Sequence, residues 1–281
     1  MKSLKFVKIH GIGNDYIYID GINSTINKLS DLSIKISNRH FGVGSDGLIA
    51  LLPSQKADFR MRMFNADGSE AEMCGNGIRG LAKMIHDHGF SKKKQLTIET
   101  LAGIMELELT LKDNKVSMVT VDMGEPILER EKIPMIGEPG HVIEETIELE
   151  DSVKFELTAV SVGNPHAIIF VEDVDNFPIE KYGSLIEKHP LFPSRINVEF
   201  VKILSSNEAK QRTWERGSGE TMACGTGATA VTVAGALTGR LDSQSTIHLL
   251  GGDLMIRWDK QTNHLFMTGP ATEVFKGEWF Y

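Results

Sequence analysis

The stretch FNADGSEAEMCGNGIRG, residues 64–80, returns 150 residues later as WERGSGETMACGTGATA at residues 214–230. Both copies contain the pattern Glu-x-x-x-Cys-Gly-x-Gly, and 224 − 74 gives the same 150-residue offset between the two cysteines. The offset also pairs Gly13-Asn14 with Gly163-Asn164. A register held over so long a window predicts a tandem duplication, and two copies favour two similar lobes facing each other across a cleft.

Length and charge narrow the class of protein. The chain has 281 residues, enough for two lobes of about 140 residues each, and 41% of them are hydrophobic, enough for two cores. The net charge of −8 argues against a nucleic-acid partner or an anionic membrane surface. Residues 221–239 carry no charge, but their four glycines and five threonines suit a buried helix better than a membrane span.

The two cysteines are informative because of where they lie. The first fifteen residues contain no apolar core of signal-peptide length, so we expect a cytoplasmic protein. In a reducing compartment two cysteines rarely form a lasting disulfide, so we expect free thiols at Cys74 and Cys224. A lone buried cysteine is usually a small hydrophobic residue, but two at equivalent positions of a repeat indicate a function.

Hydrophobic periodicity predicts a strand and a helix around each cysteine. Residues 58–64 alternate and predict a half-buried strand, and the helical spacing of apolar residues after Cys74 predicts a helix that stops at Gly89. The second copy predicts an apolar core helix from about 227 to 237, closed by Gly239. Each cysteine therefore lies at the start of a helix.

Most other segments read as strands, apart from a helix expected at 29–39. We predict an α+β fold of two pseudo-symmetric lobes, each a curved, mainly antiparallel β-sheet or barrel around a central helix, with the active site in the cleft between them. The N-terminal lobe, with Cys74, is expected to comprise 1–124 and 270–281. The C-terminal lobe, with Cys224, is expected to comprise 125–269.

Residues 42–47, GVGSDG, match the dinucleotide-binding fingerprint but lie in the wrong context. The segment follows a predicted helix and leads into a strand, whereas phosphate binding needs a strand, then the turn, then a helix. We therefore do not predict a nucleotide site.

The helix starts point to proton-transfer chemistry. A free thiol has a pKa near 8.5, and the positive end of a helix lowers it, so both thiols are expected to have lowered pKa values. Two such helix ends would also bind a carboxylate. Two thiols on either side of one carboxylate-bearing carbon could remove a proton from one face and return one to the other, which is stereoinversion.

Five motifs carry a family resemblance over essentially the whole chain: MCGNGIRG, HGIGNDY, VGNPHA, RINVEF and WERGSGETMACGTG. With them the sequence resembles the diaminopimelate epimerase family. The resemblance implies a cofactor-independent isomerase of lysine and peptidoglycan precursor biosynthesis, which interconverts LL- and meso-2,6-diaminopimelate, a small-molecule substrate. It also implies that Cys74 and Cys224 are the acid-base residues and that His166 and Glu215 are their partners. A homodimer is compatible with it.

The resemblance also assigns substrate contacts. These are Asn14, Asn65, Gly75, Asn76, Asn164, Asn197, Glu215, Arg216, Gly225 and Thr226. Some members have a glutamine where this chain has Gly47, so that side-chain contact is missing here. The 150-residue offset pairs Gly47 with Asn197, which would supply the contact from the second lobe.

Three alternatives stay open at this stage. A proline racemase or hydroxyproline epimerase of the same architecture also uses paired cysteines, although Glu215-Arg216 and the asparagines argue against it. Cys74, Cys224, His166 and Glu215 could formally ligate zinc, but no pair has the usual short spacing, so no metal is predicted. A duplicated non-catalytic module that binds a small acidic ligand would keep the helix ends without needing two thiols.

Overall fold

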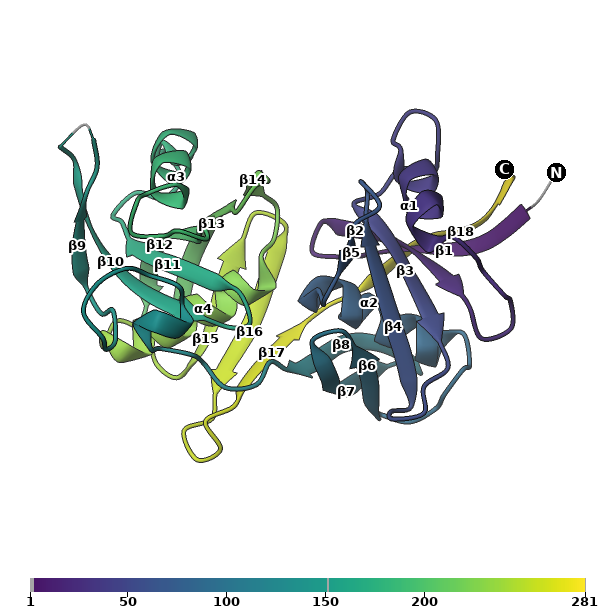
Figure 1. The fold of residues 1–281 in the computed structure, drawn as a ribbon. Coiled ribbons are helices and arrows are strands. Elements are labelled where there is room, and N and C mark those ends of the chain that lie inside the picture. The colour runs from purple at the N-terminus through teal and green to yellow at the C-terminus, as the bar shows by residue number, and fades with distance from the viewer. Residues whose placement is uncertain (1–2, 151, 281) are drawn as a thin grey trace. The chain divides into compact units, whose positions relative to one another are not determined.

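The computed structural model describes residues 3–150 and 152–280 and divides the chain into two compact units. Unit 1 comprises Met1–Asp122 and Thr268–Tyr281, and unit 2 comprises Met123–Met267. The sequence placed these two boundaries after residues 124 and 269. The chain therefore leaves unit 1, builds all of unit 2, and returns to finish unit 1 (Figure 1).

Unit 1 contains one mostly antiparallel sheet. Its strand order is β18-β1-β2-β3-β4-β6-β7-β8, with parallel pairing at β2–β3 and β4–β6 and with the short β5 beside β4. The strands are β1 (Ser3–Gly11), β2 (Asn14–Asp20), β3 (Gly47–Leu52), β4 (Phe59–Asn65), β5 (Glu70–Ala71), β6 (Gln95–Thr100), β7 (Gly103–Lys112), β8 (Lys115–Asp122) and β18 (Thr272–Phe280).

Unit 2 repeats this topology. Its order is β9-β10-β11-β12-β13-β15-β16, with parallel pairing at the equivalent places, β11–β12 and β13–β15, and with the short β14 beside β13. The strands are β9 (Glu145–Glu148), β10 (Lys154–Ser161), β11 (Pro165–Phe170), β12 (Asn197–Ser205), β13 (Glu208–Glu215), β14 (Gly219–Thr221), β15 (Gln244–Leu249) and β16 (Gly252–Trp258). Strand β17 (Leu265–Gly269) spans the boundary between unit 2 and the returning segment of unit 1. The shared order confirms the duplication.

A helix lies against the concave side of each sheet. The helices are α1 (Leu29–Ser37), α2 (Gly75–Asp87), α3 (Ile179–Glu187) and α4 (Gly225–Leu237), with a 3-10 turn η1 (Arg130–Lys132). Helix α2 contacts β1, β2 and β3 and also β8, which lies at the other end of the strand order, so the sheet curls around it. Helix α4 likewise contacts β10, β11 and β12 as well as β15 and β16. The predicted α+β fold with a central helix in each lobe is confirmed.

Apolar side chains and closing glycines explain the two central helices. Ile78, Leu81 and Ile85 of α2 are fully buried, and each such side chain contributes about 1.5–3 kcal/mol through burial. Gly89 follows the end of α2 with φ +84°, and Gly239 follows the end of α4 with φ +70°. Both occupy the left-handed conformation that glycine adopts without strain, which ends each helix as predicted.

The sequence reading missed α3. It spans Ile179–Glu187, which is Leu29–Ser37 of α1 shifted by the same 150 residues. The repeat itself was therefore the signal that could have found it. Helix α3 packs on β12, β13 and β14, as α1 packs on β3 and β4.

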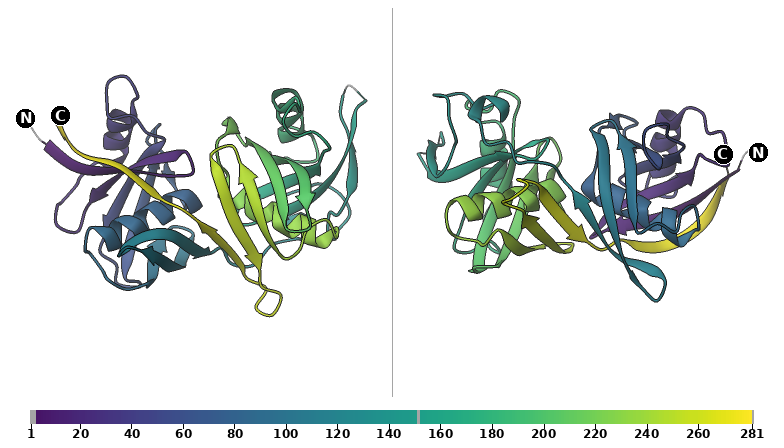
Figure 2. Two further views of the ribbon diagram at one scale, coloured as in Figure 1. Left: turned by 180° about the vertical axis from the view of Figure 1, so that it is seen from behind. Right: turned by 90° about the horizontal axis from the view of Figure 1, so that it is seen from below.

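Strand β18 lies beside β1, the first strand of the chain. It pairs antiparallel with β1 from Ser3↔Phe280 to His10↔Thr272, so the last strand of the sequence closes the first unit (Figure 2). Among the described residues, no helix is long and apolar enough to cross a membrane.

Candidate active site

Each cysteine is the N-cap residue of a central helix. Cys74 precedes α2 and Cys224 precedes α4, and each Sγ accepts a hydrogen bond at 3.4 Å from the N–H of the third helical residue, Gly77 or Gly227. Such an acceptor satisfies one of the N–H groups that have no carbonyl partner inside the helix. Both sulfurs therefore lie at the positive ends of matched helices.

In unit 1, strand β2 supplies two side chains to Cys74. The Cys74 thiol donates to Asn14 Oδ1 at 3.5 Å, and the Tyr16 hydroxyl lies 3.8 Å from Sγ, directed as a donor. Burial raises the pKa of Tyr16 well above its usual value, and the nearby Cys74 adds to this, so the hydroxyl keeps its proton. The Asn14 amide donates in turn to Asp46 at 2.7 Å, which fixes its oxygen toward the sulfur.

A buried arginine lies behind the first turn of α2. Arg79 is fully buried and donates to the Gly75 carbonyl at 3.2 Å and to Asn76 Oδ1 at 2.9 Å. Burial lowers the pKa of Arg79 to about 10, while nearby Cys74 and Tyr18 act in the opposite direction. The guanidinium is still charged at neutral pH, so unit 1 holds a positive charge close to its thiol.

In unit 2, a buried histidine and glutamate lie beside Cys224. His166 on β11 contacts Glu199 on β12 through Nδ1 at 2.7 Å and Asn164 Oδ1 through Nε2 at 3.0 Å. A ring nitrogen of His166, a carboxylate oxygen of Glu199 and the Cys224 sulfur all lie within 4.8 Å of one another. The structure thus brings the predicted partner His166 to Cys224, together with Asn164.

Glu199 is a residue of this group that the sequence reading missed. It is fully buried and accepts hydrogen bonds from Gln211 Nε2 at 2.7 Å and Thr213 Oγ1 at 2.6 Å, besides its contact with His166. The 150-residue offset pairs it with the apolar Ile49, so a search for matching residues in the two copies passes over it. A buried carboxylate with several donors marks a specialised site.

The sequence predicted a lowered pKa for the Cys224 thiol, and this prediction was wrong. Burial raises the pKa of the Cys224 thiol well above its usual value, and the carboxylates of Glu215 and Glu199 raise it further. Hydrogen bonds from the Thr226 hydroxyl and the Gly227 N–H lower this pKa, but by less than burial and the carboxylates raise it. The sequence argument counted the helix end and omitted desolvation and the two acidic neighbours, which together favour the protonated thiol.

Glu215 is the last residue of β13, and Arg216 begins the turn that follows. Glu215 accepts from Thr221 Oγ1 at 2.5 Å, and the Arg216 side chain donates to the Ser194 carbonyl at 3.0 Å. Asn197 accepts from the Arg216 backbone N–H at 2.9 Å and donates to the Pro165 carbonyl at 2.9 Å. Asn197 therefore joins the strand that carries His166 to the turn that carries Arg216.

Glu187 at the end of α3 also supports this turn and was missed with its helix. Its side chain is buried and accepts from Trp214 Nε1 at 2.8 Å and from the Gly217 N–H at 3.0 Å. It therefore holds both sides of the Glu215-Arg216 segment.

The remaining candidates fall into two groups, one in each unit. Gly75 and Asn76 begin α2 beside Cys74, and Gly225 and Thr226 begin α4, where the Thr226 hydroxyl lies 3.5 Å from the Cys224 sulfur. Asn65 ends β4, and its amide donates to Ser69 at 3.0 Å.

Gly47 has a steric reason to lack a side chain. A Cβ at this position would lie 2.2 Å from the Phe64 carbonyl oxygen. Gly47 pairs with Tyr16 as Asn197 pairs with His166, which places the two residues equivalently in the two sheets.

The group around Cys224 also bears on the zinc alternative. Histidine, glutamate and cysteine can all ligate a metal. Here both Glu199 oxygens and both His166 nitrogens already have protein partners. We interpret the group as a hydrogen-bonded network.

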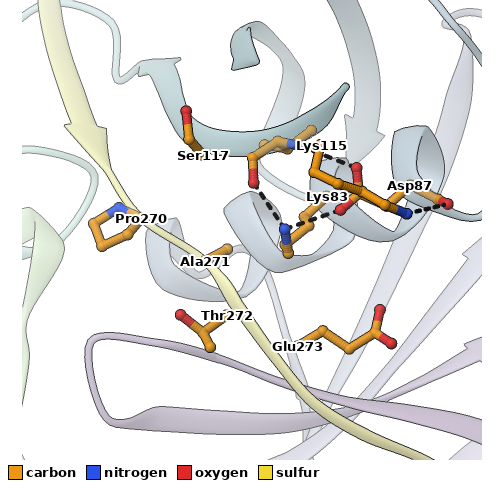
Figure 3. A pocket seen from close by; sticks show the side chains of 9 residues that line it. Lys83, Asp87, Lys115, Ser117, Pro270, Ala271, Thr272 and Glu273 are labelled. Atoms are coloured by element: carbon orange, nitrogen blue, oxygen red, sulfur yellow. Dashed lines mark hydrogen bonds and ion pairs between the residues drawn. The ribbon is translucent and has the colours of Figure 1, made fainter. Parts of the chain in front are cut away.

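A separate hollow of about 410 Å³ lies on unit 1, lined by residues of α2, β8 and the start of β18 (Figure 3). Its lysines are engaged: Lys83 pairs with Asp87 at 2.9 Å and donates to the Val116 carbonyl at 2.7 Å, and Lys115 donates to the Asp87 carbonyl at 3.3 Å. None of the candidate site residues lines it.

Comparison with known proteins identifies relatives over nearly the whole chain. The model of a family described as diaminopimelate epimerase matches residues 6–129 and 158–274. The chain is 54% identical over 275 residues to a protein of Methanococcus maripaludis (strain C6) named diaminopimelate epimerase, covering 98% of this chain and 99% of the relative.

Solved structures extend the likeness of fold. A Bacillus anthracis phenazine biosynthesis protein of the PhzF family superposes with a TM-score of 0.73 at 19% identity, covering 100% of both chains. A hydroxyproline epimerase from Agrobacterium vitis superposes with a TM-score of 0.70 at 14% identity, covering 99% of this chain and 91% of the other. At such low identities, these superpositions show that the chain shares its fold with both proteins, and nothing about its activity.

Proposed function

The chain belongs to the diaminopimelate epimerase family and is an isomerase, and from that premise we propose that it interconverts LL- and meso-2,6-diaminopimelate with Cys74 and Cys224 as its two acid-base groups. The observation that carries the proposal is the matched placement of the two sulfurs. Each caps the central helix of its unit and accepts the same N–H bond at 3.4 Å.

In the proposed reaction one thiolate takes the α-proton and the other thiol returns a proton to the opposite face. The C–H bond breaks as an S–H bond forms on the first sulfur, and the electron pair stays on the α-carbon until the second sulfur protonates it. Negative charge spreads onto the α-carboxylate in the transition state. First-turn N–H groups of α2 and α4 are oriented donors for that charge.

The other site residues receive narrower roles. We propose that His166 and Glu215 assist the thiols and that the substrate is held by Asn14, Asn65, Gly75, Asn76, Asn164, Asn197, Glu215, Arg216, Gly225 and Thr226. Among them, Arg216 is the cation suited to the distal carboxylate, because a guanidinium binds a carboxylate with two parallel hydrogen bonds. Its side chain now donates to a backbone carbonyl, which a carboxylate ligand could replace.

We further propose a cytoplasmic enzyme of lysine and peptidoglycan precursor biosynthesis that works without an added cofactor. A homodimer belongs to the same proposal, and sedimentation of the purified chain tests it. Proline and hydroxyproline are the comparison substrates, because a hydroxyproline epimerase shares the fold.

The decisive experiment is proton NMR of LL-diaminopimelate in heavy water with purified protein and reductant. Wild-type protein should exchange the α-proton and form the meso isomer, while Cys74→Ala and Cys224→Ala should each lose epimerisation and keep the wild-type circular dichroism spectrum. Thr110→Ala, at an exposed site on β7, is the control and should turn over normally. Near-normal epimerisation by either cysteine variant would exclude the two-thiol mechanism.

A further inference from the structure

The two sulfurs have equivalent positions but unequal surroundings. Under the first turn of α2 lies Ile49, whose Cδ1 would be 2.7 Å from a Cβ added to Gly77. Under the first turn of α4 lies Glu199, whose Oε1 would be 2.4 Å from a Cβ added to Gly227. The same place in the fold therefore holds an apolar side chain in unit 1 and a carboxylate in unit 2.

The Glu199 carboxylate cannot turn away from the helix without losing partners. Oε1 faces His166, and Oε2 accepts from Gln211 and Thr213. In the contacts with Gln211 and Thr213, the carboxylate oxygen is the acceptor. It is fully buried and within 4.8 Å of the Cys224 sulfur, so water does not screen the repulsion between the carboxylate and a thiolate.

The titratable and polar groups that face Cys224 within unit 2 come from three strands and its own helix. Glu215 lies on β13, Glu199 on β12 and His166 on β11, while α4 contributes the Thr226 hydroxyl and the Gly227 N–H. Burial first, and then the carboxylates of Glu215 and Glu199, outweigh these two donors and raise the pKa of Cys224.

Around Cys74, unit 1 supplies a positive charge instead. Arg79 on α2 donates to the Gly75 carbonyl at 3.2 Å, while Thr229, 150 residues later, donates to the Gly225 carbonyl at 2.9 Å. A cation thus stands where unit 2 has a neutral hydroxyl.

Strand β2 and the segment before β3 supply further groups near Cys74, among them the Asp46 carboxylate, which is separated from the sulfur by Asn14. Tyr16 and Tyr18 of β2 are neutral, since burial raises the pKa of both. Asn14 favours the thiol, because its oxygen accepts the S–H at 3.5 Å, but S–H is a weak donor and ionisation gives up little there.

We propose that Glu199 is a positioning residue that holds His166 and keeps Cys224 in the thiol form in the free enzyme, so that Cys224 is the resting proton donor and Cys74 the resting base. This inference rests on the proposed function, because it assigns the two roles that a two-thiol reaction requires. After one turnover Cys74 is the thiol and Cys224 the thiolate. Repulsion from Glu199 then favours return of a proton from water to Cys224 and its loss from Cys74.

The test titrates each thiol alone. Because the chain has two cysteines, Cys74→Ala leaves Cys224 as the only thiol, and its ionisation is followed by thiolate ultraviolet absorbance against pH. Adding Glu199→Gln should lower the midpoint by about one pH unit or more, a tenfold change in the ionisation constant. Adding Glu156→Gln, at an exposed site on β10, is the matched control and should not move it. An unchanged or raised midpoint with Glu199→Gln would overturn the proposal.

A second measurement does not depend on the folding of the Glu199 variant. The midpoint of Cys224 in Cys74→Ala should lie above that of Cys74 in Cys224→Ala, and the reverse order would also overturn the proposal. These titrations are independent of turnover. Loss of epimerisation in both cysteine variants with the wrong order of midpoints rejects this inference alone, whereas normal turnover in either variant rejects the two-thiol mechanism itself.

Discussion

A single added methyl group should affect the two units very differently. In Gly77→Ala the new Cβ would meet the far end of Ile49 at 2.7 Å, and that methyl can rotate aside. In Gly227→Ala it would lie 2.4 Å from Glu199 Oε1 and 2.7 Å from its Cδ, so the carboxylate would have to move by about 1 Å to reach ordinary contact. The difference between the two variants measures how firmly Glu199 is held.

The size of the effect follows from the bonds that must break. Moving the carboxylate weakens at least two of its bonds to His166, Gln211 and Thr213, and each hydrogen bond to a charged group contributes about 1.5–3 kcal/mol. Replacing a helical glycine by alanine stabilises the helix by about 1 kcal/mol, which offsets part of this loss. We expect Gly227→Ala to lose roughly 2 kcal/mol or more of unfolding free energy, while Gly77→Ala stays near the wild-type value.

Urea unfolding gives the two free energies, and hydrogen exchange of the α4 amides shows whether the loss arises in unit 2. If Gly227→Ala proved as stable as Gly77→Ala, Glu199 would have freedom to move, and its assignment as a fixed charge would fail.

Two further predictions concern the proposed substrate arm and acid stability. Arg216→Lys loses the planar guanidinium, so kcat/KM for diaminopimelate should fall more than tenfold, equivalent to over about 1.4 kcal/mol. The control Arg257→Lys, on β16, should not change kcat/KM. If Arg216→Lys kept the wild-type value, Arg216 would be a surface charge. For Asp87, burial opposes ionisation, but hydrogen bonds from Lys83 and the Val116 N–H outweigh it and lower the pKa below 3.8. Its contribution, about 1 kcal/mol, is present above pH 3.8 and is lost as pH falls through the lowered pKa. Asp87→Asn should therefore destabilise the protein at neutral pH and little in acid, and an equal loss at both pH values in urea titrations would contradict this.

The sequence repeat predicted the parts of the fold that are the same in both copies. It placed Cys74 and Cys224 at the starts of two central helices because identical glycines and matching apolar spacing surround them. It would also have predicted α3, had the 150-residue offset been applied to Leu29–Ser37 of α1. Similarity between copies is thus a reliable guide to backbone structure.

Differences between the copies hold much of the site chemistry, and these were harder to predict. Glu199 replaces Ile49, and Arg79 corresponds to Thr229, but sequence alone does not show that these side chains approach the sulfurs. The raised pKa of Cys224 followed from its burial and two carboxylates, while the sequence argument used only the helix end. Electrostatics depends on distances that spacing along a strand does not give.

The return of the C-terminal strand to unit 1 has a consequence during synthesis. Unit 2 is one continuous segment, Met123–Met267, whereas β1 of unit 1 pairs with β18, residues Thr272–Phe280. A growing chain can therefore complete unit 2 while β1 still lacks its outer neighbour. In most multidomain proteins the N-terminal domain matures first on the ribosome. The topology of this chain permits the opposite order, because β1 can gain its outer neighbour only after residues 272–280 have been made.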